Sequence, residues 1–234
     1  MNDRERALRL LVEGDVVVRG RMPWSSNNTF LADLCLDGER GMAVYKPVRG
    51  ERPLWDFPEG LHRRELAAYA LSEALGWGLV PETVVRDGPL GLGSLQRLVP
   101  ADFSEHYFTL LERPEHHDAL RTICAFDLVV NNADRKGGHC LLDEEGHVWS
   151  VDHGLCFHDE PKLRTVIWDF AGEPMPDPLL PSIACIAEGE LPESLDGMLD
   201  ADERAALVRR AAAILRRPRF PVPTAGRPYP WPLV

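Results

Sequence analysis

The feature that most constrains the fold is a change of residue pattern near residue 100 of this 234-residue chain. Before that point, short runs rich in β-branched and aromatic residues alternate with turn residues, which is typical of strands. After it, longer stretches carry apolar residues at helical spacing. A strand-rich half followed by a mainly helical half predicts an α+β fold of two lobes with a cleft between them.

Residues 1–100 are expected to form an N-terminal lobe, an antiparallel sheet with one main helix. Strands are predicted over residues 15–22, 29–36, 41–47, 82–86 and 93–99, and helices over residues 3–13 and 61–77. Asp37-Gly38 provides a tight turn between two of the strands, and Gly76 and Gly78 are expected to end the longer helix. The lobe closes with a hinge at residues 95–100.

Residues 101–217 are expected to form a helical C-terminal lobe that carries two polar loops. Helices are predicted over residues 115–131 and 202–216, the second capped by Asp200, and a hairpin over residues 140–142 and 147–151. A polar loop over residues 132–139 follows the first helix. Residues 218–234 contain six prolines and are interpreted as an extended tail.

The charge balance narrows the possible partners. The chain has 37 acidic and 26 basic residues, a formal net charge of −11, which argues against broad nucleic-acid binding and against an anionic membrane surface. No apolar run approaches the ~20 residues of a bilayer span, and the charged N-terminal residues are not followed by the apolar segment of a signal peptide. We therefore expect a cytoplasmic protein without membrane insertion, whose five scattered cysteines are reduced thiols.

Four residues could carry phosphoryl transfer from a nucleotide. Such a reaction needs a cation at the phosphates, an acid that holds this cation, a metal ligand, and a carboxylate near the acceptor hydroxyl. Lys46 ends the third strand and Glu65 lies early on the next helix, so the two could pair. Asp134 and Asp152 flank the predicted hairpin and can face the same small volume, which favours a Mg²⁺ site between them.

An ordered set of motifs strengthens this interpretation. Residues 127–139 and 150–157 resemble the catalytic core of phosphatidylinositol 3-/4-kinase-related proteins, in particular a small actinobacterial branch, and more distantly the HipA-type kinases. Lys46-Pro47, residues 64–69 and residues 93–99 match the N-lobe and hinge signatures in the same order, so the resemblance covers roughly residues 15–215. It implies the two-lobed protein-kinase-like fold of that family.

The resemblance also implies roles for individual residues. Lys46 would contact the nucleotide phosphates and pair with Glu65, Asp134 would orient or deprotonate the acceptor, and Asp152 would bind the metal. Backbone groups of the hinge residues would hold adenine, and a small polar loop would cover the phosphates. The hinge residues are Gln96, Arg97, Leu98 and Val99, and the loop residues are Ser25, Ser26, Asn27 and Asn28.

Two positions depart from the family pattern. His139 stands where the family usually has an asparagine as second metal ligand, and imidazole binds Mg²⁺ poorly compared with softer ions such as Mn²⁺. Lys136 stands where a histidine is common, and could either neutralise the transferring phosphate or replace that histidine structurally. These departures leave the metal open between Mg²⁺ and Mn²⁺.

The leading hypothesis is therefore an ATP-dependent kinase that phosphorylates a hydroxyl of a small polar molecule or of a protein. One alternative is a nucleotide-binding pseudokinase with a regulatory role, which His139 favours. Another is a nucleotidyl transferase that binds the nucleotide in the reverse sense. A structural zinc site at His153, Cys156 and His158 is disfavoured because no CxxC pair accompanies it.

Overall fold

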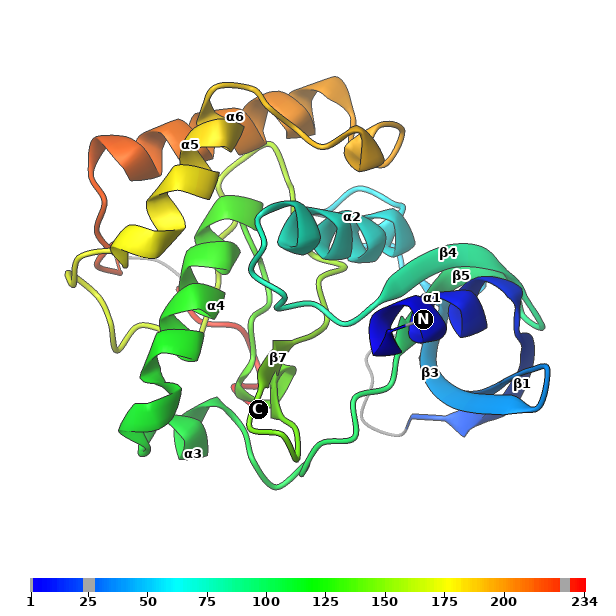
Figure 1. Ribbon diagram of the computed structural model, residues 1–234. Coiled ribbons are helices and arrows are strands. Elements are labelled where there is room, and N and C mark those ends of the chain that lie inside the picture. The colour runs from blue at the N-terminus through cyan, green and yellow to red at the C-terminus, as the bar shows by residue number, and fades with distance from the viewer. Residues whose placement is uncertain (1, 23–27, 224–227) are drawn as a thin grey trace.

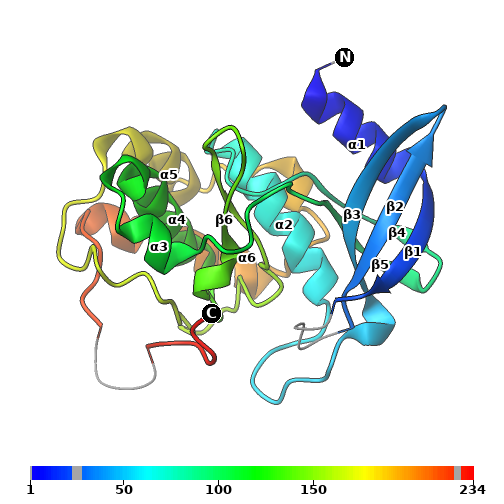
Figure 2. The same cartoon turned by 90° about the horizontal axis from the view of Figure 1, so that it is seen from below.

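The computed structural model describes residues 2–22, 28–223 and 228–234 of the chain. Figure 1 shows a strand-rich N-terminal part beside a larger helical part, and Figure 2 shows the same division from below. The two-lobed α+β arrangement predicted from the sequence is confirmed. Within these described ranges, no helix has the length and apolar character needed to cross a membrane.

One antiparallel sheet with the strand order β1-β2-β3-β5-β4 forms the N-terminal lobe. Its strands are β1 (Asp15–Arg21), β2 (Phe30–Leu36), β3 (Glu39–Pro47), β4 (Thr83–Gly88) and β5 (Gly91–Arg97). Helix α1 (Asp3–Glu13) buries Leu10 and Leu11 in the apolar core of this sheet. The predicted strands agree with the observed ones to within two residues, because alternation and turn residues are local signals.

Strand β3 separates the core of the sheet from the cleft. Ala43, Tyr45 and Pro47 are buried, so the intervening Val44 and Lys46 side chains point to the opposite face. Tyr45 is thus buried in the core of the sheet, while the Lys46 side chain is directed toward helix α2 and the helical lobe.

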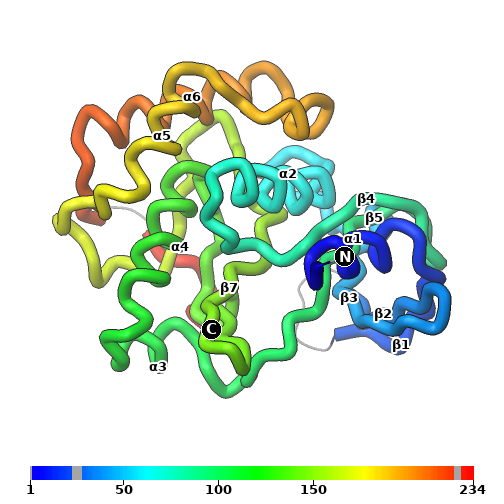
Figure 3. The backbone as a smooth tube through the Cα atoms, viewed as in Figure 1, coloured from blue at the N-terminus to red at the C-terminus, as the bar shows by residue number. Residues whose placement is uncertain are grey.

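Helix α2 (Leu61–Ala74) connects the two lobes, and it is reached through the 3₁₀ turn η1 (Val48–Gly50). It ends three residues before the predicted position, because the chain turns at Gly76, where φ is 70°. Residues Ala67, Ala68 and Leu71 belong to the apolar core of the helical lobe, although α2 precedes that lobe in sequence. The tube in Figure 3 shows α2 lying beside α4.

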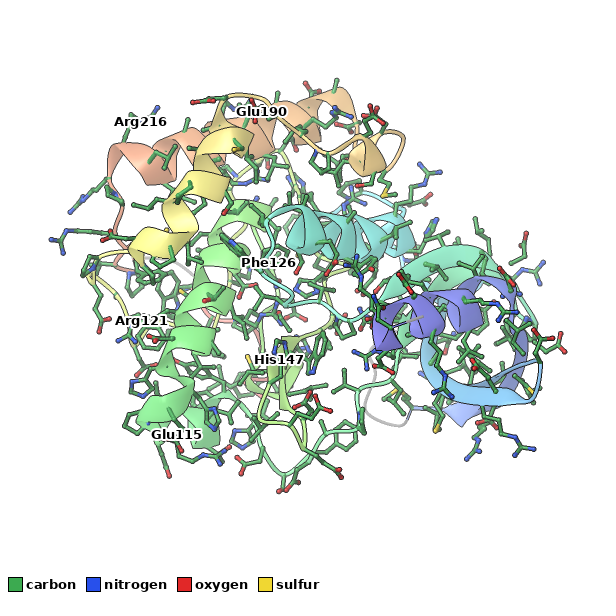
Figure 4. All side chains as sticks on the ribbon, in the orientation of Figure 1. Glu115, Arg121, Phe126, His147, Glu190 and Arg216 are labelled. Atoms are coloured by element: carbon green, nitrogen blue, oxygen red, sulfur yellow. The ribbon has the colours of Figure 1, made fainter. Side chains whose placement is uncertain are left out.

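The helical lobe surrounds α4. It consists of α3 (Tyr107–Leu111), η2 (Pro114–His116), α4 (His117–Val130), η3 (Gly137–His139), β6 (Cys140–Leu142), β7 (Val148–Ser150), η4 (Asp177–Leu179), α5 (Leu180–Ala187), η5 (Glu193–Leu195) and α6 (Ala201–Arg216). Phe126 of α4 points into the interior and is fully buried (Figure 4). The helix ends where Asn131 adopts a φ of 56°, one residue before the predicted end.

The described part of the C-terminal tail packs against the polar loop after α4. The Gly137 N–H donates to the Leu233 carbonyl at 2.7 Å, and the Thr165 N–H donates to the Pro228 carbonyl at 3.0 Å. The C-terminus accordingly lies next to the β6–β7 hairpin (Figure 2). Residues 228–234 thus support the segment that carries Asp134.

Candidate active site

Three charged side chains from three separate elements meet between the lobes. The Lys46 Nζ on β3 donates to the Glu65 carboxylate on α2, and it lies 2.7 Å from Asp152 Oδ1, two residues after β7. The Glu65 side chain is only 4% exposed, whereas that of Asp152 is 50% exposed. Lys46 therefore contacts both a buried carboxylate, that of Glu65, and a half-exposed one, that of Asp152. The expected Lys46–Glu65 contact is present.

The two carboxylates keep Lys46 charged. Burial alone would lower the pKa of Lys46, but the negative charges of Asp152 and Glu65 outweigh burial and raise it. Burial would raise the pKa of Asp152, but the attraction of Lys46 dominates and holds that pKa well below its usual range. The site therefore presents an ammonium group and an ionised, solvent-facing carboxylate at neutral pH.

Helix α2 is also tied to the loop that carries Asp152. The second carboxylate oxygen of Glu65 accepts the His153 N–H at 3.0 Å. A Cβ at Gly154 would lie 3.4 Å from both Glu65 Oε1 and the Leu61 Cβ, so the loop passes close to the helix. Asp152 has a φ of 62°, in the left-handed region, and this backbone turn sets the direction of its carboxylate.

Asp134 sits in a loop that a buried asparagine shapes. The Asn132 Oδ1 accepts the Asp134 N–H at 3.0 Å, and the Asn132 Nδ2 donates to Asp127 at 2.9 Å. The Lys136 Nζ lies 2.9 Å from Asp134 Oδ2. Burial raises the pKa of Asp134, Lys136 opposes this rise, and the negative charge of Asp152 adds to it. The charge of Asp152 thus acts on Asp134.

Arg135 is the functional residue that the sequence interpretation missed. Its side chain is fully buried and forms an ion pair with Asp127, with Nε 2.9 Å from Asp127 Oδ2. It also donates to the Val151 carbonyl at 2.8 Å and lies 2.9 Å from His153 Nε2. Arg135 therefore joins α4, the Asp134 loop and the Asp152 loop. The available signal was Asp127, an acid within a largely apolar helix, which needs a buried partner.

His139 lies beside Asp152, but the hydrogen bond that its ring accepts favours a tautomer with the proton on Nε2. Burial lowers the pKa of His139 to about 3, so the ring is neutral at pH 7. Its Nδ1 accepts the Lys136 N–H at 3.4 Å, which leaves the ring proton on Nε2, 3.4 Å from Asp152 Oδ2. Coordination of a metal through Nε2 requires the other tautomer.

The donor set fits a metal that arrives with a nucleotide. Within residues 2–22, 28–223 and 228–234, no group of three His, Cys, Asp or Glu side chains is arranged to hold a metal by itself. Mg²⁺ in nucleotide sites is bound by one or two carboxylates together with substrate phosphates. The half-exposed Asp152 carboxylate, with Asp134 nearby, meets that requirement.

The expected hinge residues divide between the sheet and the connection. Gln96 and Arg97 lie within β5, where the Gln96 side chain donates to Thr83 Oγ1 at 2.9 Å. The Arg97 N–H donates to the carbonyl of Glu82, just before β4, at 2.8 Å, and the Leu98 N–H donates to that of Met42 in β3 at 3.0 Å. Val99 is the next residue and Pro100 has no N–H, so Val99 has the first hinge amide beyond these sheet contacts.

The expected phosphate loop is only partly described. Ser25, Ser26 and Asn27 lie outside the described residues. Asn28 is exposed, and its N–H donates to the Gly50 carbonyl at 3.2 Å. A Cβ at Gly50 would lie 2.7 Å from the Asn28 Cβ, so glycine is required at position 50 for this approach. Asn28 therefore contacts the segment that follows Lys46.

A cavity of about 510 Å³ opens beside the segment that connects β3 to α2 and beside the first turn of α2. Its lining residues include Glu51, Arg52, Glu59 and Arg63. Phe57 and Leu61, also in its wall, cluster with Ala133 and Leu155. The cavity therefore adjoins the Asp134 loop.

Comparison with known proteins agrees with this geometry. Residues 84–199 match the family described as phosphatidylinositol 3- and 4-kinase. The chain is 44% identical to Protein Rv2133c of Mycobacterium tuberculosis, over 99% of this chain and 96% of that protein. The crystal structure of a Helicobacter pylori proinflammatory kinase, CtkA, has a similar fold, with a TM-score of 0.51 and 12% identity over 88% of this chain and 93% of that chain. The fold is thus kinase-like, with residues 84–199 similar to the phosphatidylinositol 3- and 4-kinases, and the chain belongs to the same family as Protein Rv2133c.

Proposed function

We propose that the chain is an ATP-dependent phosphotransferase that moves the γ-phosphate of metal-bound ATP to a hydroxyl of a small polar molecule or of a protein. The observation that carries this proposal is the contact of Lys46 with both Glu65 and Asp152, beside the Asp134 loop. A fixed cation, a metal-binding carboxylate and a base are the groups that phosphoryl transfer requires. The family to which the chain belongs supports the same reaction class.

In this proposal each residue has one task. Lys46, positioned by Glu65, binds the phosphates, and Val99 and the adjoining hinge residues bind adenine through the backbone. Asp134 accepts the proton of the acceptor hydroxyl. The oxygen of that hydroxyl forms a bond to the γ-phosphorus, while the bond between the γ-phosphorus and the oxygen that bridges to the β-phosphate breaks. Burial raises the pKa of Asp134, which makes it a stronger proton acceptor than an exposed aspartate. Lys136 neutralises charge on the transferred phosphate.

Asp152 would bind the metal, which supplies positive charge at the phosphates. The His139 Nδ1 accepts the Lys136 N–H, which leaves the ring proton on the Nε2 that lies 3.4 Å from Asp152 Oδ2, so we assign the primary ligand role to Asp152 alone. Turnover with Mg²⁺ that at least equals turnover with Mn²⁺ would agree with this assignment. A strong preference for Mn²⁺ that disappears in His139→Asn would instead identify His139 as a ligand.

The test is consumption of γ-labelled ATP in the presence of a polar metabolite extract, with Mg²⁺ and with Mn²⁺. Asp134→Asn is expected to reduce transfer by about 10²–10⁴-fold, the usual contribution of a general base. Lys46→Met should reduce it by about 10²–10³-fold through lost charge stabilisation. The exposed Asp177→Asn serves as the matched control and should retain activity. Equal activity of all four proteins would contradict the proposal.

A pseudokinase is the second candidate, because His139 stands where the family pattern has an asparagine and so offers no oxygen ligand beside Asp152. A pseudokinase would show a nucleotide-dependent rise of melting temperature and no turnover with either metal. The mass of any product separates phosphate transfer from nucleotidyl transfer.

A further inference from the structure

The segment over residues 155–164, called here the acceptor-side segment, connects the Asp152 loop to the rest of the helical lobe. Both of its ends are bonded to residues adjoining Asp134: the Ala133 N–H donates to the Leu155 carbonyl at 2.8 Å, and the Arg164 N–H donates to the Asn132 carbonyl at 2.9 Å. The two ends of the segment therefore lie next to the Asp134 loop. Under the proposed function, the segment is adjacent to the residue that activates the acceptor.

One side chain holds the middle of the acceptor-side segment. The Asn131 Nδ2 donates to the His158 carbonyl at 2.9 Å and to the Glu160 carbonyl at 2.7 Å, while its Oδ1 accepts the Lys162 N–H at 2.9 Å. Asn131 is 3% exposed, so these bonds form away from solvent. Its φ of 56° at the end of α4 directs the side chain toward the segment, a backbone conformation that asparagine tolerates.

Two arginines add further contacts from separate elements. The Arg210 Nη1 on α6 donates to the His158 carbonyl at 3.1 Å, and its Nε donates to the Val129 carbonyl at 2.8 Å. The Arg164 Nη2 lies 3.2 Å from Asp56 Oδ2, in the connection that leads to α2. The acceptor-side segment is thus bonded to both lobes.

The acceptor-side segment lacks the groups that protein kinases phosphorylate. Residues 155–164 contain no serine, threonine or tyrosine. The adjoining Thr165 is 2% exposed, and its Oγ1 accepts the Ile167 N–H at 3.0 Å. Phosphorylation that orders such a segment by adding charge is therefore excluded by the sequence itself.

We propose that Asn131 is the positioning residue that keeps the acceptor-side segment seated beside Asp134, so that the site is competent without modification of that segment. The statement that the site is competent for phosphate transfer rests on the proposed function, whereas the contacts of Asn131 do not. Three hydrogen bonds from the buried Asn131 side chain hold this segment, whereas a segment ordered by phosphorylation is held by the added charge.

The test is amide hydrogen exchange of the full chain, followed residue by residue. Asn131→Gly removes all three bonds yet tolerates the left-handed backbone, and should speed exchange of the Lys162 amide by about a hundredfold. Asn131→Asp keeps an acceptor for that amide but sets a second oxygen against the His158 and Glu160 carbonyls, so it should restore only part of the protection. Asp37→Gly, at a left-handed turn residue in the sheet, is the matched control and should leave Lys162 unchanged. Unchanged exchange in Asn131→Gly, or faster exchange spread equally over α4, would overturn the proposal.

Turnover separates a positioning role from general damage. In Asn131→Gly the KM for ATP should stay within about twofold while phosphate transfer falls by about tenfold or more. An equal loss in nucleotide affinity would count against the inference. A wild-type chain that consumes ATP only after modification within residues 155–164 would also overturn it. Absence of any turnover, with the exchange pattern as expected, would refute the proposed function and leave the contact of Asn131 established.

Discussion

Replacing Arg135 with methionine should destabilise the chain strongly, because it leaves the buried Asp127 carboxylate without its cation. The Asp127 side chain is 1% exposed, and its remaining side-chain donor would be Asn132 Nδ2 at 2.9 Å. Removing one partner of a buried ion pair costs about 3–5 kcal/mol. At about 2–4 °C per kcal/mol for a chain of this size, the melting temperature should fall by about 6–20 °C.

The double variant Asp127→Leu with Arg135→Met isolates the ion pair from the other contacts. Each single change leaves a buried charge, whereas the double change removes both charges. The Val151 and His139 carbonyls still lose a donor, at about 1–3 kcal/mol each. The double variant should therefore be about as unstable as one single variant, which corresponds to a coupling energy of about 3 kcal/mol.

Urea unfolding provides the measurement, followed by far-UV circular dichroism and by the fluorescence of the six tryptophans. The midpoint should shift without a change of slope, since the same surface is exposed on unfolding. Strictly additive effects, or a cost below about 1 kcal/mol for Arg135→Met, would refute the reasoning, because an uncompensated buried charge cannot be that inexpensive.

Three further predictions concern packing, thiols and capping. Gly137→Ala should lower the free energy of unfolding in urea by about 1–3 kcal/mol, because its Cβ would lie 3.1 Å from the Phe108 ring. A variant as stable as the wild type would contradict close packing at this position. In the folded chain, two of the five thiols should react with a disulfide reagent, because three are buried; reaction of all five without denaturant would count against this burial. The two exposed thiols are Cys35 and Cys185. Asp200→Ala should cost about 1 kcal/mol of unfolding free energy, because its carboxylate accepts the Glu203 N–H at 2.8 Å, and an equal effect of Asp202→Ala would show that the cap is not the cause.

The local elements were predictable because their signals are local. The capping aspartate at position 200 begins α6 as expected, and the strands around Asp37-Gly38 lie where alternation and turn residues place them. Helices α2 and α4 were predicted to extend too far. Their real ends depend on single left-handed residues, Gly76 and Asn131, whose backbone conformation hydropathy does not reveal.

The partners of charged side chains were harder to predict. Asp134-Arg135 could have formed a simple salt bridge within the loop, but Arg135 turns inward to Asp127 while Lys136 pairs with Asp134. An exposed pair gains little free energy, whereas an acid within an apolar helix requires a buried cation. Which cation reaches it depends on how the loop is folded, and adjacency in sequence does not indicate this.

The sequence by itself determined the two-lobed arrangement and the side chains available for phosphoryl transfer, because residue pattern and residue chemistry are written along the chain. Tertiary structure decided that Lys46 contacts both Glu65 and Asp152, that Arg135 joins two loops to α4, and that Asn131 holds residues 155–164. These contacts join residues from different elements. Their geometry follows from how the lobes pack, since burial and close approach select one set of partners among many that the sequence permits.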